Sequence, residues 1–235
     1  MLGQKSFGAR LATIVLLTSA LLACGDSEPT QRKAFIEFLQ TRIVAKPGVH
    51  VPKPTAEQTA GFGDYAKHYA VIADFNAGLD QVVSKPLQRA LETAPRSLDQ
   101  LVPRRNEIAT IKDGMAKLRA ALDQQLASAD AAHAALKQPA DLKPVYDSAY
   151  DRDVTQPAKA FTEIFPDVDA AMDSILALVD FLDQHRDKIK IEGPMMRVSD
   201  PSLQPRLQSL VDALRAKQEA IQKAQQRLNA IVHGG

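Results

Sequence analysis

The feature that most constrains the fold of this chain is an unbroken apolar stripe at helical spacing between residues 104 and 137. Successive members are three or four residues apart, which places their side chains on one face of an α-helix. At 1.5 Å per residue, this helix would measure about 50 Å. A helix with one apolar face must bury that face against other elements. The members are Ile108, Ile111, Met115, Leu118, Leu122, Leu126, Ala129, His133 and Leu136.

Similar stripes predict further helices on both sides of this one. Prolines separate them, because proline lacks the amide hydrogen that a helix interior needs. Thr55 and Gln58 have the spacing of a capping box, which marks the start of a helix. The first expected helix covers residues 31–45. A long helix follows from residue 56, which Pro86 kinks or ends and Pro95 closes at the latest. The others cover 104–137, an interrupted segment 144–165 that Pro157 divides, a strong helix 167–188 that Asp167 opens, and a last helix that starts at Pro201 or after Pro205 and extends to residue 232.

Residues 189–198 show a different pattern. Ile189–Glu192 alternates apolar and charged side chains, and Met195–Val198 can pair back onto it across Gly193-Pro194. Glycine at the first central position suits a type II′ turn, and a loop is the alternative. We therefore predict an all-α fold, an elongated antiparallel helical bundle with one small β-hairpin near residues 189–198.

The start of the chain has the parts of a secretory signal. Lys5 and Arg10 precede an apolar run over residues 11–23, which is shorter than the roughly 20 apolar residues that a transmembrane helix needs. The run ends in Leu21-Leu22-Ala23-Cys24, the pattern of a bacterial lipoprotein cleavage site. Cys24 is the only cysteine of the chain, so a disulfide within one chain is excluded.

This signal predicts three parts of the chain: a cleaved signal peptide at 1–23, a lipidated tether at 24–30 and a single helical periplasmic domain at 31–235. Acyl chains such as palmitate on Cys24 would bind the membrane without crossing it. Each buried methylene contributes about 0.8 kcal/mol, so two or three chains anchor a protein stably. Gly25 replaces the aspartate that commonly retains an enterobacterial lipoprotein in the inner membrane. We expect the periplasmic face of the outer membrane, with the inner membrane as the alternative.

The charge of the chain is balanced. The formal net charge is +1, and removing residues 1–23 with Lys5 and Arg10 brings it to −1. Positive and negative side chains are interleaved, so the sequence gives no electrostatic basis for binding nucleic acid.

The sequence offers no local metal-binding or cofactor motif. None of the five histidines lies three or four residues from another, and no second cysteine is present. His133 lies on the apolar stripe, where we expect a packed or hydrogen-bonded side chain rather than a metal ligand. We therefore expect no metal, no cofactor and no catalytic residues.

Carboxylates gather around Tyr146 and Tyr150: Asp147, Asp151 and Asp153. A calcium site or an acid–base pair is conceivable there, but the glycine and the final glutamate of an EF-hand loop are missing. Lys143 lies four residues before Asp147, the spacing of an ion pair on a helix. We expect a solvated, salt-bridged face.

Two runs of sequence carry a resemblance to a known family. They are Gln31–Gln40 and the stretch from Asp130 to Asp147, which contains Asp130-Ala131-Ala132-His133-Ala134-Ala135-Leu136-Lys137-Gln138. Together with the lipoprotein signal and the order of helices, they resemble the YiaF-like family of bacterial lipoproteins. The resemblance implies a lipoprotein of unknown function and transfers no catalytic or binding residues.

Three functions remain open. The first is a non-catalytic helical interaction or scaffold module of the cell envelope, bound to the membrane through Cys24 and to an envelope protein. Its surface of interest comprises His133, Asp147, Asp151, Ile191 and Met196. The second is a carrier of an apolar ligand in the bundle core, where Met115, Met172, Met195 and Met196 would line a pocket. A void among the stripes would favour this second function. The third and least favoured is an uncharacterised hydrolase.

Overall fold

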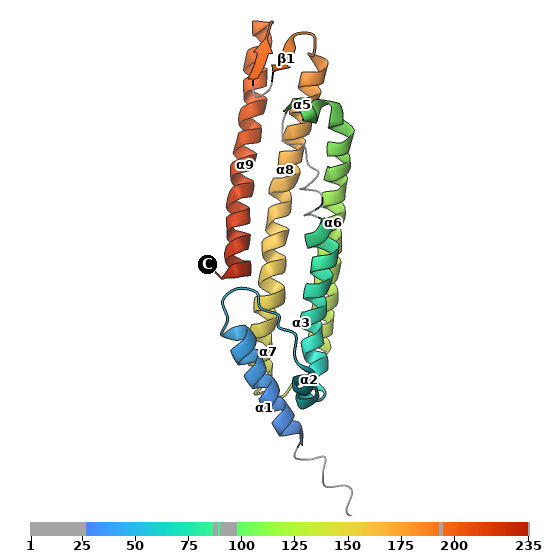
Figure 1. Ribbon diagram of the computed structural model, residues 1–235, viewed down its shortest axis with the longest axis vertical. Helices are drawn as coiled ribbons and strands as arrows, with labels where there is room; N and C mark the ends of the chain where they lie inside the picture. Colours follow the sequence, from blue (N-terminus) through green and yellow to red (C-terminus); the bar gives the residue numbers. More distant parts are fainter. Residues whose placement is uncertain (1–26, 87–88, 90–97, 193–194, 235) are drawn as a thin grey trace, which may run out of the picture.

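The computed structural model describes residues 27–86, 89, 98–192 and 195–234, which form an elongated helical bundle (Figure 1). Its α-helices are α1 (Ser27–Leu39), α2 (Ala56–Phe62), α3 (Tyr65–Leu79), α5 (Leu98–Leu101), α6 (Arg105–Ala135), α7 (Lys143–Tyr150), α8 (Gln156–Gln184) and α9 (Gln204–His233). Wider π-helical turns extend three of them: η1 (Gln40–Val44), η2 (Asp80–Ser84) and η4 (Asp151–Thr155). The 3₁₀ turns η3 (Val102–Arg104) and η5 (Pro201–Leu203) precede α6 and α9. The predicted all-α bundle is confirmed.

The capping box before α2 forms as predicted. The amide of Gln58 donates to the Thr55 hydroxyl at 3.1 Å, and the Thr55 amide donates to Oε1 of Gln58 at 2.9 Å. The single long helix expected from residue 56 is wrong, however, because it is broken after Phe62. Gly63 takes φ 55°, which a helix interior excludes, and the chain starts again at Tyr65 as α3.

The helix expected to begin at Asp167 is also wrong, because α8 runs without interruption from Gln156 to Gln184. Pro157 lies in its first turn, where the missing amide hydrogen costs nothing. Pro166 lies inside the helix and removes one hydrogen bond. The helix continues there because α8 packs along its length on α6 and α9, which offsets the loss.

A large aromatic core fills one end of the bundle, which we call the base. It lies between α1, α2, α3, α7 and the adjoining part of α6. Phe35 is fully buried, with ring centroids 5.3 Å from Phe62 and 5.8 Å from Tyr65. Phe38 meets Tyr69 edge to face at 5.2 Å. Aromatic pairs of this kind contribute about 0.5–1.5 kcal/mol beyond the area they bury.

The opposite end of the bundle has a smaller core. Strands β1 (Ile189–Glu192) and β2 (Met195–Val198) pair antiparallel with Ile191 opposite Met196, so the predicted hairpin is confirmed. Its turn lies outside the described residues. The buried members of this core come from α8, β1 and α9: Leu178, Leu182, Ile189, Leu207 and Leu210.

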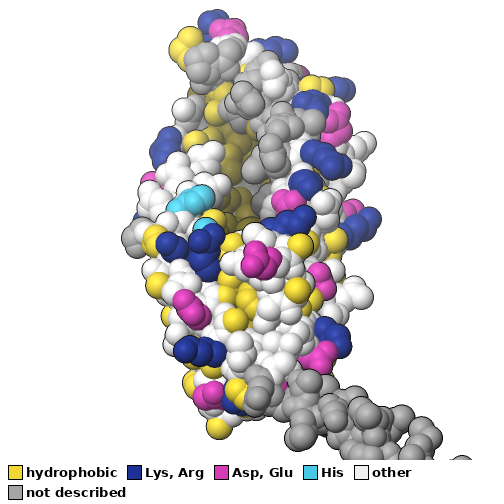
Figure 2. Space-filling model, turned by 60° about the horizontal axis from the view of Figure 1, so that its bottom comes forward, with side chains coloured by type: hydrophobic (Ala, Val, Ile, Leu, Met, Phe, Trp, Pro, Cys, Tyr) yellow, Lys and Arg dark blue, Asp and Glu magenta, His cyan; other side chains and the backbone are white. Residues whose placement is uncertain are grey.

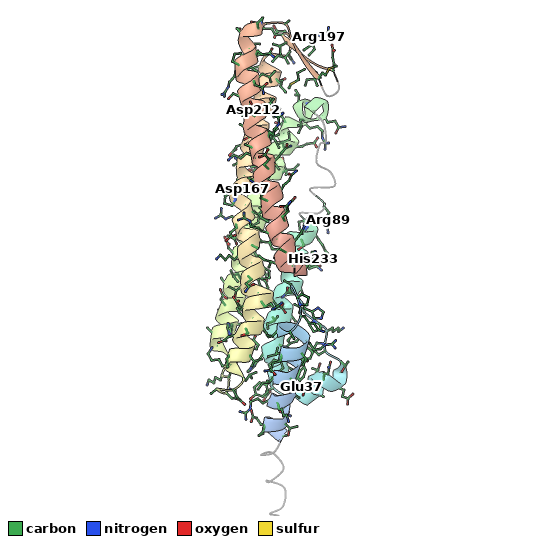
Figure 3. All side chains as sticks on the ribbon, turned by 90° about the vertical axis from the view of Figure 1, so that its left-hand side faces the viewer. Glu37, Arg89, Asp167, Arg197, Asp212 and His233 are labelled. Atoms are coloured by element: carbon green, nitrogen blue, oxygen red, sulfur yellow. The ribbon has the colours of Figure 1, made fainter. Side chains whose placement is uncertain are left out.

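The linker between η1 and α2 ties the base to the end of α9. The amide of Val49 donates to the carbonyl of Val232 at 3.0 Å, and the Arg152 guanidinium donates to the carbonyl of Gly48 at 3.0 Å. Gly48 takes φ 68°, and a Cβ there would lie 2.4 Å from the Val232 oxygen, so only glycine allows this approach. Figure 3 shows His233, at the end of α9, close above the part of the molecule that contains Glu37.

Candidate functional site

The most developed candidate site is an apolar groove between α6, α8 and α9. Helix α8 packs against both neighbours, whereas α6 and α9 make few contacts with each other. These two helices therefore form the walls of a groove whose floor is α8. Its volume is about 470 Å³, within the range of roughly 300–1,000 Å³ typical of ligand pockets. Figure 2 shows hydrophobic side chains inside a hollow in the upper part of the molecule.

The described lining of the groove contains no charged side chain. It consists of Val83, Leu101, Ile108, Ile111, Met115, Leu118, Phe161, Ile164, Phe165, Val168, Met172, Ile175, Ile221, Gln225, Leu228 and Asn229. Gln225 and Asn229 are the polar members, and both are exposed at the surface of α9. The chemistry of this lining suits an apolar molecule with one polar end.

Ion pairs hold the α6 wall against the α8 floor. Lys112 binds Asp173, and Arg105 forms a forked pair with Asp180. Hydrogen bonding to the guanidinium lowers the pKa of Asp180. These contacts fix the antiparallel register of the two helices, so Ile108 near the start of α6 lies beside the later turns of α8.

Of the four methionines proposed as pocket residues, the structure places two in the groove and two elsewhere. Met115 on α6 and Met172 on α8 line the groove. Met195 and Met196 lie on β2 of the hairpin instead, and Met195 is 67% exposed. The two groove methionines are unbranched and flexible, which allows a pocket to adapt to its ligand.

Two of the predicted surface residues, His133 and Asp147, meet at the base. Nε2 of His133 lies 2.9 Å from Oδ1 of Asp147, and the Lys143 ammonium binds Oδ2 at 2.6 Å. Partial burial acts to raise the pKa of Asp147, but the hydrogen bonds from Lys143 and His133 lower it overall. Asp147 is therefore an ion-paired carboxylate, as its spacing from Lys143 predicted.

Aromatic rings surround this histidine. The ring of His133 lies 4.1 Å from that of Tyr150 and 5.4 Å from that of Tyr146, centroid to centroid. The Tyr150 hydroxyl donates to Asp130 at 2.7 Å, and burial with this hydrogen bond raises its pKa. No serine, threonine or cysteine hydroxyl or thiol within the described chain is recorded as bonded to His133. The expectation of a hydrogen-bonded histidine is confirmed.

The remaining predicted residues lie apart from one another. Asp151 accepts from Gln156 at 2.7 Å and does not join His133. Ile191 and Met196 face each other across the hairpin and pack half-buried against the small upper core, so they are not a free surface. Cys24 and Gly25 lie outside the described residues.

Asp153 contradicts the expected solvated face, because its side chain is fully buried. The π-helical turn η4 rotates it inward, where Oδ1 accepts from the His50 amide at 3.1 Å and Oδ2 has no protein partner. Burial raises its pKa to about 7, against the opposing effects of the His50 amide and Arg152. No pattern in the sequence distinguishes Asp153 from the exposed Asp151 of the same turn.

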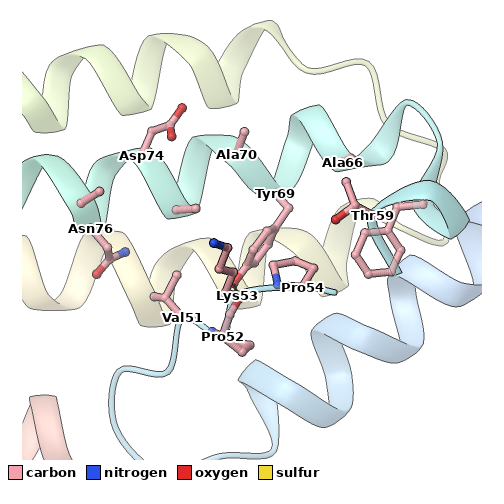
Figure 4. A pocket seen from close by; sticks show the side chains of 13 residues that line it. Val51, Pro52, Lys53, Pro54, Thr59, Ala66, Tyr69, Ala70, Asp74 and Asn76 are labelled. Atoms are coloured by element: carbon pink, nitrogen blue, oxygen red, sulfur yellow. Dashed lines mark hydrogen bonds between the residues drawn. The ribbon is translucent and has the colours of Figure 1, made fainter. Parts of the chain in front are cut away.

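A second pocket of about 430 Å³ lies between the linker and α3 (Figure 4). The Tyr69 hydroxyl donates to the Pro52 carbonyl at 2.5 Å, which fixes the linker along one edge. Its floor is a row of alanines on α3 and its rim carries Lys53 and Asp74. This pocket is more open to solvent than the groove, so we regard the groove as the principal site.

Within the described residues, no three histidine, cysteine, aspartate or glutamate side chains are grouped to hold a metal ion. Among the same residues, no helix is long and apolar enough to span a bilayer.

The pocket proposed from the sequence for an apolar carrier includes Met115 and Met172, and both line the groove. Ile108 and the other aliphatic lining residues belong to stripes that a sequence assigns to helix packing, whether or not the stripes meet. One signal was available on α9. Gln225 follows Ile221 by four residues and precedes Leu228 by three, which puts an amide in the apolar stripe.

The fold and the groove define an all-α bundle protein with a lateral apolar groove. The chain belongs to the family described as "Protein of unknown function (DUF3053)", which it matches over residues 11–229. It is 28% identical over 218 residues to "Uncharacterized protein YiaF" of Escherichia coli K12, covering 92% of each chain. The protein of that name from Shigella flexneri is equally similar. The resemblance to a YiaF-like family is thus confirmed, and no solved structure matches the chain.

Proposed function

We propose that the protein is a lipid-anchored, non-catalytic component of the bacterial envelope that holds an apolar ligand in the groove. The observation that carries the proposal is a void of about 470 Å³ among the helical stripes, with no charged side chain in its described lining. A carrier of an apolar ligand needs a void between its helices, whereas a bundle with a filled core leaves no room for one. Mechanistically, ligand burial would supply the binding free energy, about 25 cal/mol per Å² of apolar surface removed from water.

The dye N-phenylnaphthylamine, which fluoresces in apolar surroundings, tests this function. The purified protein would lack residues 1–23 and carry Cys24→Ser, so that neither the apolar signal segment nor a lipid of its own competes for the dye. We expect saturable binding, weakened at least about tenfold by Val168→Trp, whose larger ring would fill the void on α8 (tenfold corresponds to about 1.4 kcal/mol).

Val211→Phe is the matched control, because Val211 is a half-buried valine of α9 outside the groove. Circular dichroism establishes that both variants fold. Equal dye binding by the wild type and by folded Val168→Trp would show that the groove is not the site.

The anchor remains part of the proposal and rests on the sequence alone. Cys24→Ala should give an uncleaved precursor that incorporates no labelled palmitate, and normal labelling would contradict it. Gly25→Asp should move the protein from the outer to the inner membrane in an enterobacterial host. Density-gradient separation of the membranes measures this shift, and an unchanged distribution of the two forms would refute the sorting rule.

A second function, interaction with an envelope protein, is favoured by the hairpin. Met195 is a large hydrophobic side chain exposed at 67% of its surface, at the end of the bundle opposite α1. Exposed apolar side chains of this kind often mark contacts with a partner. Replacing Met195 by Lys should reduce crosslinking to an envelope protein in cells, whereas the exposed Gln124→Ala should not. If both variants crosslink like the wild type, the hairpin is not the interface.

A further inference from the structure

We infer that the ligand of the groove is a single-chain acyl lipid with an uncharged polar end, whose polar end lies at Gln225 and Asn229. This inference rests on the proposed function and names the ligand class and its orientation. Three features carry it: the length of the groove, its width and the placement of its two amide side chains.

The length of the groove matches one acyl chain. Its floor on α8 extends from Phe161 to Ile175, which measures about 21 Å at 1.5 Å per residue. The hydrocarbon core of a bilayer is about 30 Å thick and contains two leaflets, so one acyl chain spans about 15 Å. A chain of membrane-lipid length and its adjoining polar group therefore fit along the floor.

The groove is also narrow for its length. A volume of about 470 Å³ distributed along this length of α8 describes a long, slender space rather than a broad one. The groove therefore suits an extended methylene chain.

The polar residues set the orientation. Leu207 and Leu210 of α9 pack with Leu178 and Leu182 of α8, and the helices are antiparallel. Asn229, about five turns further along α9, therefore lies near Phe161, at the end of the groove that faces the base. The opposite end, near Leu101 and Ile175, offers only apolar side chains in the described lining.

The amides also set the chemistry of the polar end. Gln225 and Asn229 each donate and accept hydrogen bonds and carry no charge, which suits hydroxyl and ester groups. A carboxylate at this position would gain no cation from the described lining and would use only the donor groups of the two amides. We therefore expect monopalmitoylglycerol to bind about tenfold more tightly than palmitate, and Gln225→Leu with Asn229→Leu to abolish that preference.

The absence of tryptophan from the chain makes the orientation measurable. Leu228→Trp and Ile175→Trp each place one indole at one end of the groove, the polar end and the apolar end, on residues that are only half-buried, whereas Val168 lies between the two ends. Saturable binding of N-phenylnaphthylamine by each variant shows that its groove still accepts a ligand, and loss of dye binding by both would contradict a groove long enough for an acyl chain. Bromine quenches tryptophan fluorescence only at short range. Monoacylglycerol brominated near the methyl end should quench Ile175→Trp at least about threefold more than Leu228→Trp, and bromination near the ester should reverse the ratio.

The outcomes separate this inference from the proposed function. If N-phenylnaphthylamine binds but neither acyl lipid displaces it, the ligand class is wrong and the apolar site survives. If palmitate binds as tightly as monopalmitoylglycerol, the assignment of an uncharged polar end is wrong. If each brominated lipid quenches the two indoles equally, the orientation is wrong. If neither the dye nor either lipid binds the folded protein, both the inference and the proposed function fail.

Discussion

The base and the groove are built from the same kind of helix but are packed differently. In the base, aromatic side chains occupy the stripes, and all four tyrosines of the chain lie there. Each tyrosine hydroxyl donates to a partner: Glu28 for Tyr65, Pro52 for Tyr69, His68 for Tyr146 and Asp130 for Tyr150. Large rings with satisfied hydroxyls fill the space between helices and fix their positions.

Around the groove, the stripes are mostly aliphatic and belong to helices that do not all meet. Residues such as Ile175, Leu228 and Leu118 are only half-buried, although they face the interior of the bundle. Close-packed interiors leave few voids larger than a water molecule, so a void of this size is a feature to explain. The tightly packed base therefore supplies stability, whereas the helices around the groove are packed less tightly and leave space for a ligand.

The largest effect should come from truncating an aromatic ring of the base. Phe35→Ala removes a ring with no exposed surface that contacts Phe62 and Tyr65, and we expect a loss of about 3–5 kcal/mol in the free energy of unfolding. Ile175→Ala in the groove should cost less than about 1.5 kcal/mol, because its side chain already borders a void. Urea unfolding followed by circular dichroism measures both. Similar losses would mean that the groove is packed as tightly as the base.

The second effect concerns Asp153, whose carboxyl is the one buried charged group recorded in the described residues. Its pKa is raised from 3.8 to about 7 in the folded protein, so the folded state retains a proton that the unfolded state has lost. Stability from this group is therefore fully present below about pH 4 and is lost as the pH rises to about 7, by an amount on the order of 4 kcal/mol.

Asp153→Asn tests this prediction, because an amide keeps the shape of the protonated acid and does not ionise. The variant should lose the decline in stability between about pH 4 and 7. Asp151→Asn, at an exposed carboxylate of the same turn, is the control and should keep it. A wild-type protein whose free energy of unfolding is flat over this range would refute the role of Asp153.

The base was easier to predict from the sequence than the groove. A stripe containing Phe62, Tyr65 and Tyr69 must be buried somewhere, and the capping box at Thr55 marks where the first of its two helices begins. The burial of Asp153 depends on a π-helical turn, which changes the face of the helix and has no pattern of its own. The void depends on the distance between α6 and α9. The spacing of apolar residues along each helix predicts which face is buried but does not predict this distance.

The junction between the two regions should give an effect of intermediate size. Gly48→Ala would place a Cβ 2.4 Å from the Val232 oxygen and would force a residue with a side chain to adopt φ 68°. We expect a loss of about 1–3 kcal/mol. Gly61→Ala is the matched control, since Gly61 lies on α2 with open space around its Cβ position, and it should be neutral or slightly stabilising. Equal effects would mean that the linker does not need this close approach.

The smallest effect should come from the ion pair beside the groove. Arg105 and Asp180 form a forked pair, but their side chains are 46% and 39% exposed, so water and salt screen the attraction. A double-mutant cycle with Arg105→Ala and Asp180→Ala should give a coupling energy of about 0.2–1 kcal/mol, which falls as salt is added. Because hydrogen bonding lowers the pKa of Asp180, this contribution is present at neutral pH and is lost as the pH falls through that pKa. A coupling energy above about 2 kcal/mol, or one that does not change with salt concentration, would mean that the α6 wall is held to α8 by charge rather than by its apolar stripe. The groove would then be expected to open at high ionic strength, and binding of N-phenylnaphthylamine measured across the same salt series would detect that opening.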